Sequence, residues 1–332
     1  MKTLLIRSGT AEAAEVANRA KQMGCYIVMA DRGLEVPAFA YSDSCLLADA
    51  TNPDEMLPAA ERFSRKLRKI DGVITISDAA LPAAAAVAER LGLWGPLPET
   101  VKLLADKLAT KQRLLEAGLS VPWFAPVATP QALQRILIER GTDLLIWPAD
   151  NRSVAMNPIE VKDLDAAFTS ARRKSRTQRV IAEEKVTAQQ MTAYTVMSAG
   201  RTRALLLRSG SDAPDDLCTE LQSSVGSVLL RIAVAIGLVD GPLRIDLAVE
   251  DANFSIVDVA VQLSFGAAVD QAEKLLDALI QLSVAKSSPT VLPRLCVRRL
   301  SPELSVTCDI REQACSRAGG RFKEPSLDRH VV

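Results

Sequence analysis

The chain has 332 residues, 48% of them hydrophobic and 24% charged, and its 40 basic and 40 acidic side chains cancel. A neutral chain without an apolar run of about 18 residues is expected to bind neither nucleic acid nor membranes. The single histidine, His330, argues against Ser-His-Asp chemistry and against zinc held by histidines. Six scattered cysteines without a Cys-x-x-Cys pair, and a start that soon turns polar, predict a cytoplasmic protein with reduced thiols and no signal peptide.

The first part of the chain, residues 1–95, predicts a parallel α/β domain. Apolar runs predict strands at 3–8, 25–31 and 71–76, and helical spacing predicts helices at 11–24, 55–70 and 80–93. The stretch GPLPET then breaks the chain and marks a boundary near residue 95. The turn at 8–10 has one glycine, whereas a nicotinamide site needs a GxGxxG turn. A plain α/β turn is therefore favoured over a nicotinamide site. A nicotinamide-dependent reductase is the least favoured of three possible functions, after the two that are given at the end of this subsection.

The rest of the chain predicts an α+β architecture. Residues 101–122 are predicted to form one amphipathic helix that ends at a glycine, with a proline beyond it. Further helices are predicted at 132–141, 161–176, 221–238 and 270–286, strands at 143–148 and 179–186, and β-hairpins at 192–210 and 243–263. The expected divisions are an N-terminal domain (1–95), a linker helix with a central small lobe (96–180), a C-terminal lobe with carboxylate-bearing strands (181–286) and an irregular tail (287–332).

Four stretches follow one another in a specific order: VKLLADKLATKQRLLEAGLSVP, RVIAEEKV, GLVDGPLRIDLAV and FSIVDVAVQLSFGAA. This order resembles the ATP-grasp superfamily, ligases that activate a carboxylate as an acylphosphate, over residues 1 to about 280. The resemblance implies an N-terminal parallel α/β domain followed by a two-lobed ATP-grasp-like domain. It also implies ATP and magnesium as cofactors and a small-molecule carboxylate or amine as substrate.

The resemblance implies that Lys107 is the first lysine that contacts the nucleotide. The second lysine of the superfamily, which reaches the phosphates, is replaced by Trp147, and the following loop DNRSVA has no glycine. An indole donates one neutral hydrogen bond and carries no charge, so both changes weaken phosphate binding. The alternative for Lys107 is an exposed helix lysine without a ligand.

The resemblance also implies that Glu183 and Glu184 lie on the strand over which adenine sits. Gln190, or Gln189 beside it, takes the place of the glutamate that would hold the ribose. An amide can still hydrogen-bond a hydroxyl group. The alternative for the two glutamates is an edge strand with solvated carboxylates.

The metal site implied by the resemblance has two carboxylates, Asp246 and Asp258, which are expected to share one sheet face with Arg244 as a catalytic residue. The positions of a further asparagine ligand and of a phosphate-binding arginine hold Ala260 and Gln262. The alternative is a structural Asp–Arg set across two strands.

Two functional classes remain. Trp147 and the lost ligands favour a pseudo-ligase with an eroded nucleotide site, which acts as a binding module or partner subunit. Retained Lys107, Asp246 and Asp258 favour an active ATP-dependent carboxylate–amine ligase. The basic run at 172–176 lacks interleaved aromatic residues and is expected to be a solvated helix end rather than an RNA site. The arginine-containing tail favours a homodimer or association with a related protein.

Overall fold

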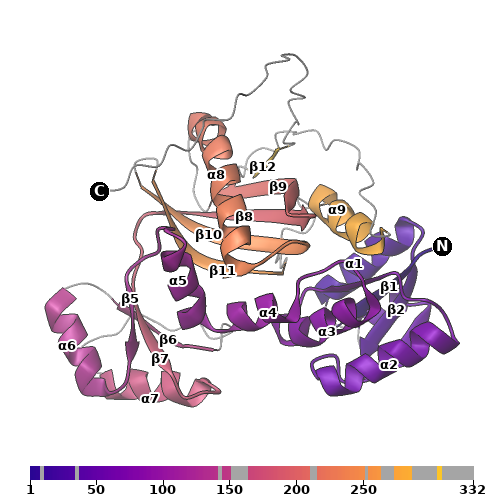
Figure 1. The fold of residues 1–332 in the computed structure, drawn as a ribbon, viewed down its shortest axis with the longest axis horizontal. Coiled ribbons are helices and arrows are strands. Elements are labelled where there is room, and N and C mark those ends of the chain that lie inside the picture. The colour runs from indigo at the N-terminus through magenta and orange to yellow at the C-terminus, as the bar shows by residue number, and fades with distance from the viewer. Residues whose placement is uncertain are drawn as a thin grey trace, which may run out of the picture.

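The protein is described by a computed structural model that covers residues 1–7, 11–33, 37–140, 144–150, 164–209, 215–250, 253–262, 273–285 and 305–308. The predicted turn at 8–10, the loop after residue 150 and most of the tail lie outside these residues. Figure 1 shows an N-terminal sheet with its helices, a small lobe, and a large twisted sheet beside a long helix. Within the described part, no helix has the length and apolar character to cross a membrane.

The N-terminal part is a parallel sheet of four strands in the order β3-β2-β1-β4. Its elements are β1 (Thr3–Arg7), α1 (Ala11–Gln22), β2 (Tyr26–Asp31), η1 (Pro37–Tyr41), β3 (Ser44–Leu47), α2 (Pro53–Lys66), β4 (Gly72–Thr75), η2 (Asp78–Ala80) and α3 (Leu81–Leu91). The predicted parallel sheet is confirmed. The edge strand β3 escaped prediction because it is four residues long and only half buried.

The predicted single helix over 101–122 is wrong. The chain forms α4 (Pro98–Ala105) and α5 (Lys107–Glu116), with Asp106 in an extended conformation between them at φ −107° and ψ 105°. The Asp106 carboxylate accepts a hydrogen bond from the Ala109 amide and so caps the second helix. Aspartate favours this N-cap position because its oxygen satisfies an otherwise unpaired N–H of the first turn. The helical spacing of apolar residues continues through Asp106, so this spacing alone does not indicate the break.

The small lobe is an antiparallel sheet in the order β5-β7-β6, covered by two helices. Its elements are β5 (Phe124–Val127), α6 (Pro130–Arg140), β6 (Leu144–Pro148), α7 (Leu164–Lys174) and β7 (Val180–Glu184). Because β7 is the central strand, this sheet extends past residue 180. Its core contains Leu133, Leu144, Ile146 and Phe168.

The large sheet has the order β11-β10-β8-β9-β12. Its strands are β8 (Gln189–Ser198), β9 (Arg201–Ser209), β10 (Gly241–Glu250), β11 (Asn253–Ala260) and β12 (Ser305–Cys308), and α8 (Asp215–Ile236) lies beside it. Both predicted hairpins are confirmed, and the first turns at Ala199 and Gly200, which have φ of 52° and 69°. The prediction of an irregular tail is wrong for Ser305–Cys308, which pairs with β9.

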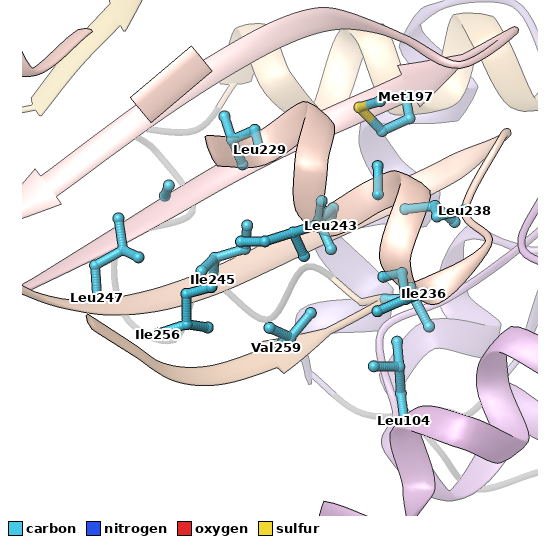
Figure 2. Packing of buried hydrophobic residues seen from close by; sticks show 14 of the residues in the cluster. Leu104, Met197, Leu229, Ile236, Leu238, Leu243, Ile245, Leu247, Ile256 and Val259 are labelled. Atoms are coloured by element: carbon cyan, nitrogen blue, oxygen red, sulfur yellow. The ribbon is translucent and has the colours of Figure 1, made fainter. Parts of the chain in front are cut away.

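One face of the large sheet packs against α8. Figure 2 shows side chains from the helix, among them Leu229 and Ile236, over Leu243 and Ile245 of the sheet. Leu104 of α4 joins the same cluster, so the linker helix is anchored on this core. The chain continues from this anchored linker through α5 into the small lobe.

The last long helix, α9 (Glu273–Val284), packs on both the N-terminal sheet and the large sheet. Leu276 and Leu279 share a buried cluster with Leu4 and Ile6 of β1. Arg19 of α1 donates to the carboxylate of Asp277 at 2.6 and 2.7 Å. At Gly72 the approach is so close that an added Cβ would lie 2.4 Å from the carbonyl oxygen of Ser283.

We expect Gly72→Ala to lower the free energy of unfolding by about 1–3 kcal/mol, because the methyl group has to push the α9 backbone away. Urea unfolding followed by circular dichroism measures the change. Gly33→Ala is the control, since the nearest atom to its added Cβ lies 4.0 Å away. Equal midpoints for the two variants would contradict the packing described here.

Candidate functional site

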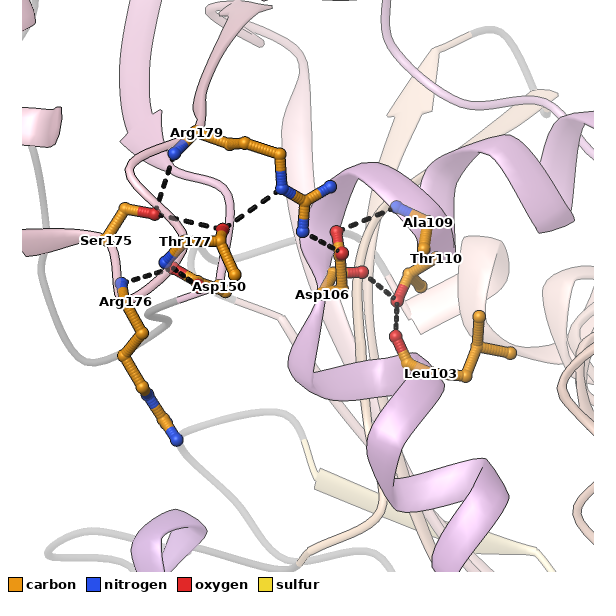
Figure 3. Close-up of polar contacts among 9 residues, drawn as sticks. All are labelled: Leu103, Asp106, Ala109, Thr110, Asp150, Ser175, Arg176, Thr177 and Arg179. Carbon is orange, nitrogen blue, oxygen red and sulfur yellow. Dashed lines mark hydrogen bonds and ion pairs between the residues drawn. The ribbon is translucent and has the colours of Figure 1, made fainter.

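The start of α5 is fixed by polar contacts around the helix break. Arg179, which precedes β7, forms an ion pair with the Asp106 carboxylate that caps the helix (Figure 3). The Lys107 amide donates to the Ala149 carbonyl at 2.6 Å, which ties the first residue of α5 to the end of β6. The break between α4 and α5 therefore places Lys107 beside β6 of the small lobe.

A second set of contacts holds the end of β6. The Asp150 carboxylate accepts hydrogen bonds from the backbone amides of Arg176 and Thr177 at 3.0 and 2.8 Å (Figure 3). Burial acts to raise the pKa of Asp150, but its hydrogen bonds with Ser175 and Thr177 outweigh burial and lower that pKa. Asp150 is thus held as a carboxylate, which ties the end of β6 to the segment before β7.

Three buried charges meet between α5 and β7. The ammonium of Lys107 lies 2.9 Å from one carboxylate oxygen of Glu183, and the ammonium of Lys111 pairs with the other. All three side chains are more than nine-tenths buried. Burial lowers the pKa of Lys111, and the charge of Glu183 acts in the opposite direction. These residues form a lysine–glutamate cluster in which two cations share one anion.

Trp147 on β6 closes this cluster from one side. The Lys107 ammonium lies 4.1 Å from the centroid of the indole ring, a distance at which a cation is attracted to the ring face. Among the described residues, the indole Nε1 of Trp147 has no hydrogen-bond partner. The ammonium that was predicted to contact phosphate is thus in contact with both an aromatic face and a carboxylate.

The two carboxylate strands carry a second polar cluster. Asp246 and Asp258 are direct cross-strand neighbours on β10 and β11. Nη2 of Arg244 lies 3.0 Å from Oδ2 of Asp246 and 3.5 Å from Oδ2 of Asp258. Thr192 Oγ1 donates to Asp246 at 2.8 Å. The structure thus brings the three predicted residues together on one face.

The second cluster has one cation for two anions, whereas the first has two cations for one anion. Burial opposes the positive charge of Arg244, but Asp246 and Asp258 outweigh burial and raise the pKa of the guanidinium. The charge of Asp258 also acts to raise the pKa of Lys111, so the two clusters lie within electrostatic reach of each other.

The residues present do not fit a magnesium site in this arrangement. Magnesium requires several oxygen ligands in a near-octahedral arrangement. In the part of the chain that the structure describes, no three acidic, histidine or cysteine side chains gather to hold a metal. The guanidinium of Arg244 contacts both carboxylates where a cation would have to bind.

Among the described residues, Glu184 and Gln190 take no part in the ion pairs of either cluster, although Glu184 directly follows Glu183 on β7. Glu184 is half buried, 3.5 Å from a guanidinium nitrogen of Arg140, and borders a cavity of about 580 Å³ between the end of β7 and the end of β10. Gln190 is exposed and pairs in register with Ala248. The structure therefore supplies a hollow beside Glu184 but no contact of either residue with Lys107.

Comparisons with known proteins fit this architecture. Residues 17–95 match the family model of the ATP-grasp N-terminal domain. Solved structures extend the likeness to most of the chain. The match with the L-amino acid ligase of Bacillus licheniformis covers 86% of this chain and 74% of that protein's chain, with a TM-score of 0.66 and 18% sequence identity. The chain has the ATP-grasp fold. The predicted class, α/β plus α+β, is confirmed.

Two further solved structures of similar fold were determined as nucleotide complexes. The N5-carboxyaminoimidazole synthetase of Staphylococcus aureus, complexed with ADP, is 16% identical over 87% of this chain and 78% of its own, with a TM-score of 0.67. The biotin carboxylase of Campylobacter jejuni, in a β,γ-ATP complex, is 16% identical over 87% of this chain and 72% of its own, with a TM-score of 0.68. Identities this low establish the fold alone.

One curated relative matches a shorter stretch. The uncharacterized protein y4rH of Sinorhizobium fredii is 27% identical over 101 residues, which are 30% of this chain and 21% of that protein. The chain therefore matches only about a fifth of this relative's length, and the similarity applies to that stretch alone.

Lys111 is a further residue of the cluster that was not predicted from the sequence. Its ammonium pairs with Glu183 and lies 5.7 Å from the ring centroid of Phe124. The only signal was its spacing: residues 107 and 111 are one helical turn apart and so share a helix face. The alternative of an exposed Lys107 is wrong, since this side chain is buried.

Proposed function

We propose that this chain is a pseudo-ligase: an ATP-grasp protein whose nucleotide site is eroded and which serves as a binding module or partner subunit. The observation that carries the proposal is the engagement of Lys107. Its ammonium lies 2.9 Å from a buried Glu183 oxygen and 4.1 Å from the centroid of Trp147. A phosphate has to break this buried ion pair before it can use the lysine.

The carboxylate strands support the same proposal. Asp246 and Asp258 both contact Arg244, so a metal ion would have to displace a charged guanidinium. A charge-assisted contact contributes roughly 1.5–3 kcal/mol. The loss of one lysine, one glycine loop and one metal ligand then weakens nucleotide binding by about 4–8 kcal/mol, or about three to six powers of ten.

The alternative is an active ATP-dependent carboxylate–amine ligase with altered phosphate contacts. The direct pairing of Asp246 with Asp258 across two strands favours it, since two carboxylates are placed side by side. In that case Lys107 holds phosphate, Arg244 acts as the catalytic residue, and Glu183, Glu184 and Gln190 contact the nucleoside. A cytoplasmic location and a homodimer, or a complex with a related protein, stay predictions under both proposals.

For the pseudo-ligase we expect half-saturation by ATP–magnesium on the order of 1 mM, because Lys107 is engaged and Trp147 supplies no charge. Isothermal titration calorimetry of the pure protein measures the affinity, and an ATPase assay without acceptor follows. Lys107→Met is the matched variant. It should leave the weak affinity nearly unchanged, because the ammonium contributes little to binding.

Half-saturation below about ten micromolar would overturn the proposal, since other groups would then replace the lost contacts. A loss of affinity of tenfold or more in Lys107→Met, together with ATP hydrolysis by the parent, would favour the active ligase instead. Arg244→Met tests the metal side of the site: magnesium-dependent tightening of ATP binding in this variant alone would show that the guanidinium blocks the metal.

A further inference from the structure

The outer face of α8 is apolar, although this helix lies on the surface of the large sheet. Its inner face, with Leu229 and Ile236, is buried against that sheet. A surface helix ordinarily has polar side chains opposite its buried face. On α8 that side has Leu230, which is 43% exposed, and Val234, which is 82% exposed. Among the described residues, Val234 is the most exposed of the large hydrophobic side chains.

The exposed residues of α8 follow one another at the spacing of a contact between two helices. The row in the described part of the helix, which we call the α8 seam, consists of Ser227, Leu230, Val234 and Gly237. Steps of three and four residues keep such a row on one side of a helix, as in the seam of paired helices. The exposed cation beside the seam, Arg231, is held to one side, because its guanidinium donates to the Gly118 carbonyl at 2.9 Å.

The α8 seam has the same order of residue sizes in both directions: small, large, large, small. An antiparallel pair of α8 helices, related by a two-fold axis level with Ile232, would place Leu230 of each copy against Val234 of the other. Ser227 would lie against Gly237, where the small residues let the two backbones approach. A two-fold interface requires such self-complementarity, because every contact in it occurs twice.

The surroundings of the α8 seam also suit a second copy of the same chain. The helices α4 and α5 pack beside α8. Their exposed charged residues are two acids and two bases: Glu99, Lys102, Arg113 and Glu116. The whole chain is neutral as well, with 40 basic and 40 acidic residues. Two copies are therefore not repelled from each other, whereas a strongly charged partner would find no complementary surface here.

We propose that two copies of this chain associate through the α8 seam, as a two-fold symmetric, antiparallel pair of helices. The inner face of α8 is fixed by the core of the large sheet, so the seam is already held in place before the second copy binds. The seam contains no residue of the two polar clusters. The proposal therefore does not depend on whether the chain is a pseudo-ligase or an active ligase.

The test is the mass of the protein in solution, measured by sedimentation equilibrium over a dilution series from millimolar to micromolar concentration. The parent should approach twice the chain mass of 35.7 kDa. Leu230→Glu and Val234→Lys each place an unpaired charge against an apolar side chain of the other copy. Each is expected to weaken association by about a hundredfold or more. Ile138→Glu is the control, because Ile138 is 75% exposed on α6 of the small lobe and should not affect the dimer.

An equimolar mixture of the Leu230→Glu and Val234→Lys chains tests the antiparallel arrangement. In the mixed pair, the new carboxylate at position 230 of one chain meets the new ammonium at position 234 of the other, and the second Leu–Val contact is unchanged. The mixture should therefore regain the dimer that neither variant forms alone. Both positions are exposed in the single chain, so both variants should fold, and circular dichroism checks this.

Three results would overturn the proposal. A parent that stays monomeric throughout the dilution series does so, whatever else covers α8. Dimers that persist in both Leu230→Glu and Val234→Lys would place the contact on another surface. A mixture that stays monomeric would exclude the antiparallel pairing of Leu230 with Val234. No nucleotide is present in these measurements, so none of these results bears on the proposed function.

Discussion

Glu183→Gln is expected to lower the free energy of unfolding by about 3–5 kcal/mol, the largest loss of any substitution considered. The change leaves the ammonium groups of Lys107 and Lys111 buried without an anion between them. Removing one partner from a buried ion pair is strongly destabilising, because the remaining charge keeps the penalty of its burial. Chemical denaturation monitored by tryptophan fluorescence measures the loss.

Lys111→Met is the matched control for this prediction. It leaves one lysine with one glutamate, and replacing a buried ammonium by an apolar chain of similar length is expected to change stability far less. In the double variant Glu183→Gln/Lys111→Met, part of the loss should be recovered. If the double variant is as unstable as Glu183→Gln, the loss does not come from uncompensated charge.

The same cluster predicts a dependence on pH. Burial lowers the pKa of Lys111 from its ordinary 10.5, so below that value the unfolded chain takes up a proton before the folded chain does. The stability contributed by Lys111 is complete above about pH 10.5 and is lost as the pH falls through the folded-state pKa. The stability of the parent relative to Lys111→Met should therefore increase toward pH 10.5.

Trp147→Lys is expected to change both stability and nucleotide affinity. It removes an indole that covers Lys107 and brings a third ammonium to a cluster that already has two cations for one anion. Losing a fully packed aromatic side chain costs about 3 kcal/mol, so the half-buried Trp147 should cost less, and the added repulsion acts in the same direction. The additional positive charge should raise the affinity for ATP–magnesium by one to two powers of ten.

A thermal-shift series with and without ATP–magnesium measures both effects at once. The variant alone should melt below the parent, and its rise on adding nucleotide should be larger. Trp147→Phe is the control: it keeps an aromatic face beside Lys107, adds no charge, and should gain no affinity. A lysine variant that melts like the parent and gains nothing would show that residue 147 does not face the phosphates.

The fold was largely predictable from the sequence because its elements have strong local patterns. The buried strand β1 is a continuous apolar run, and the turn at Ala199 and Gly200 allows the positive φ that a tight hairpin needs. The break at Asp106 was not predictable, because apolar spacing runs on through it. Asp106 caps the second helix locally, and its ion pair with Arg179, 73 residues further along the chain, adds a tertiary contact that no local pattern indicates.

The sequence was sufficient to predict which residues of the candidate site share a face of the sheet. It was not sufficient to predict which side chains form ion pairs with one another. Register alone puts Asp246, Asp258 and Arg244 on one face, because side chains alternate along a strand. Nothing local indicates that Lys107 is buried or that Glu183 neutralises it, since this depends on how α5 meets the small lobe.

The docking of α9 on the N-terminal sheet has a consequence for how this protein is made. The bond between Arg19 and Asp277 joins residues 258 positions apart, and Leu276 and Leu279 complete a core that begins with Leu4. During synthesis, the first sheet emerges from the ribosome long before the helix that covers it. Its uncovered apolar face is then exposed to aggregation or to chaperones until the chain has reached α9. A shortened gene product that ends after the first 95 residues should therefore be poorly soluble, even though its strands and helices are all present.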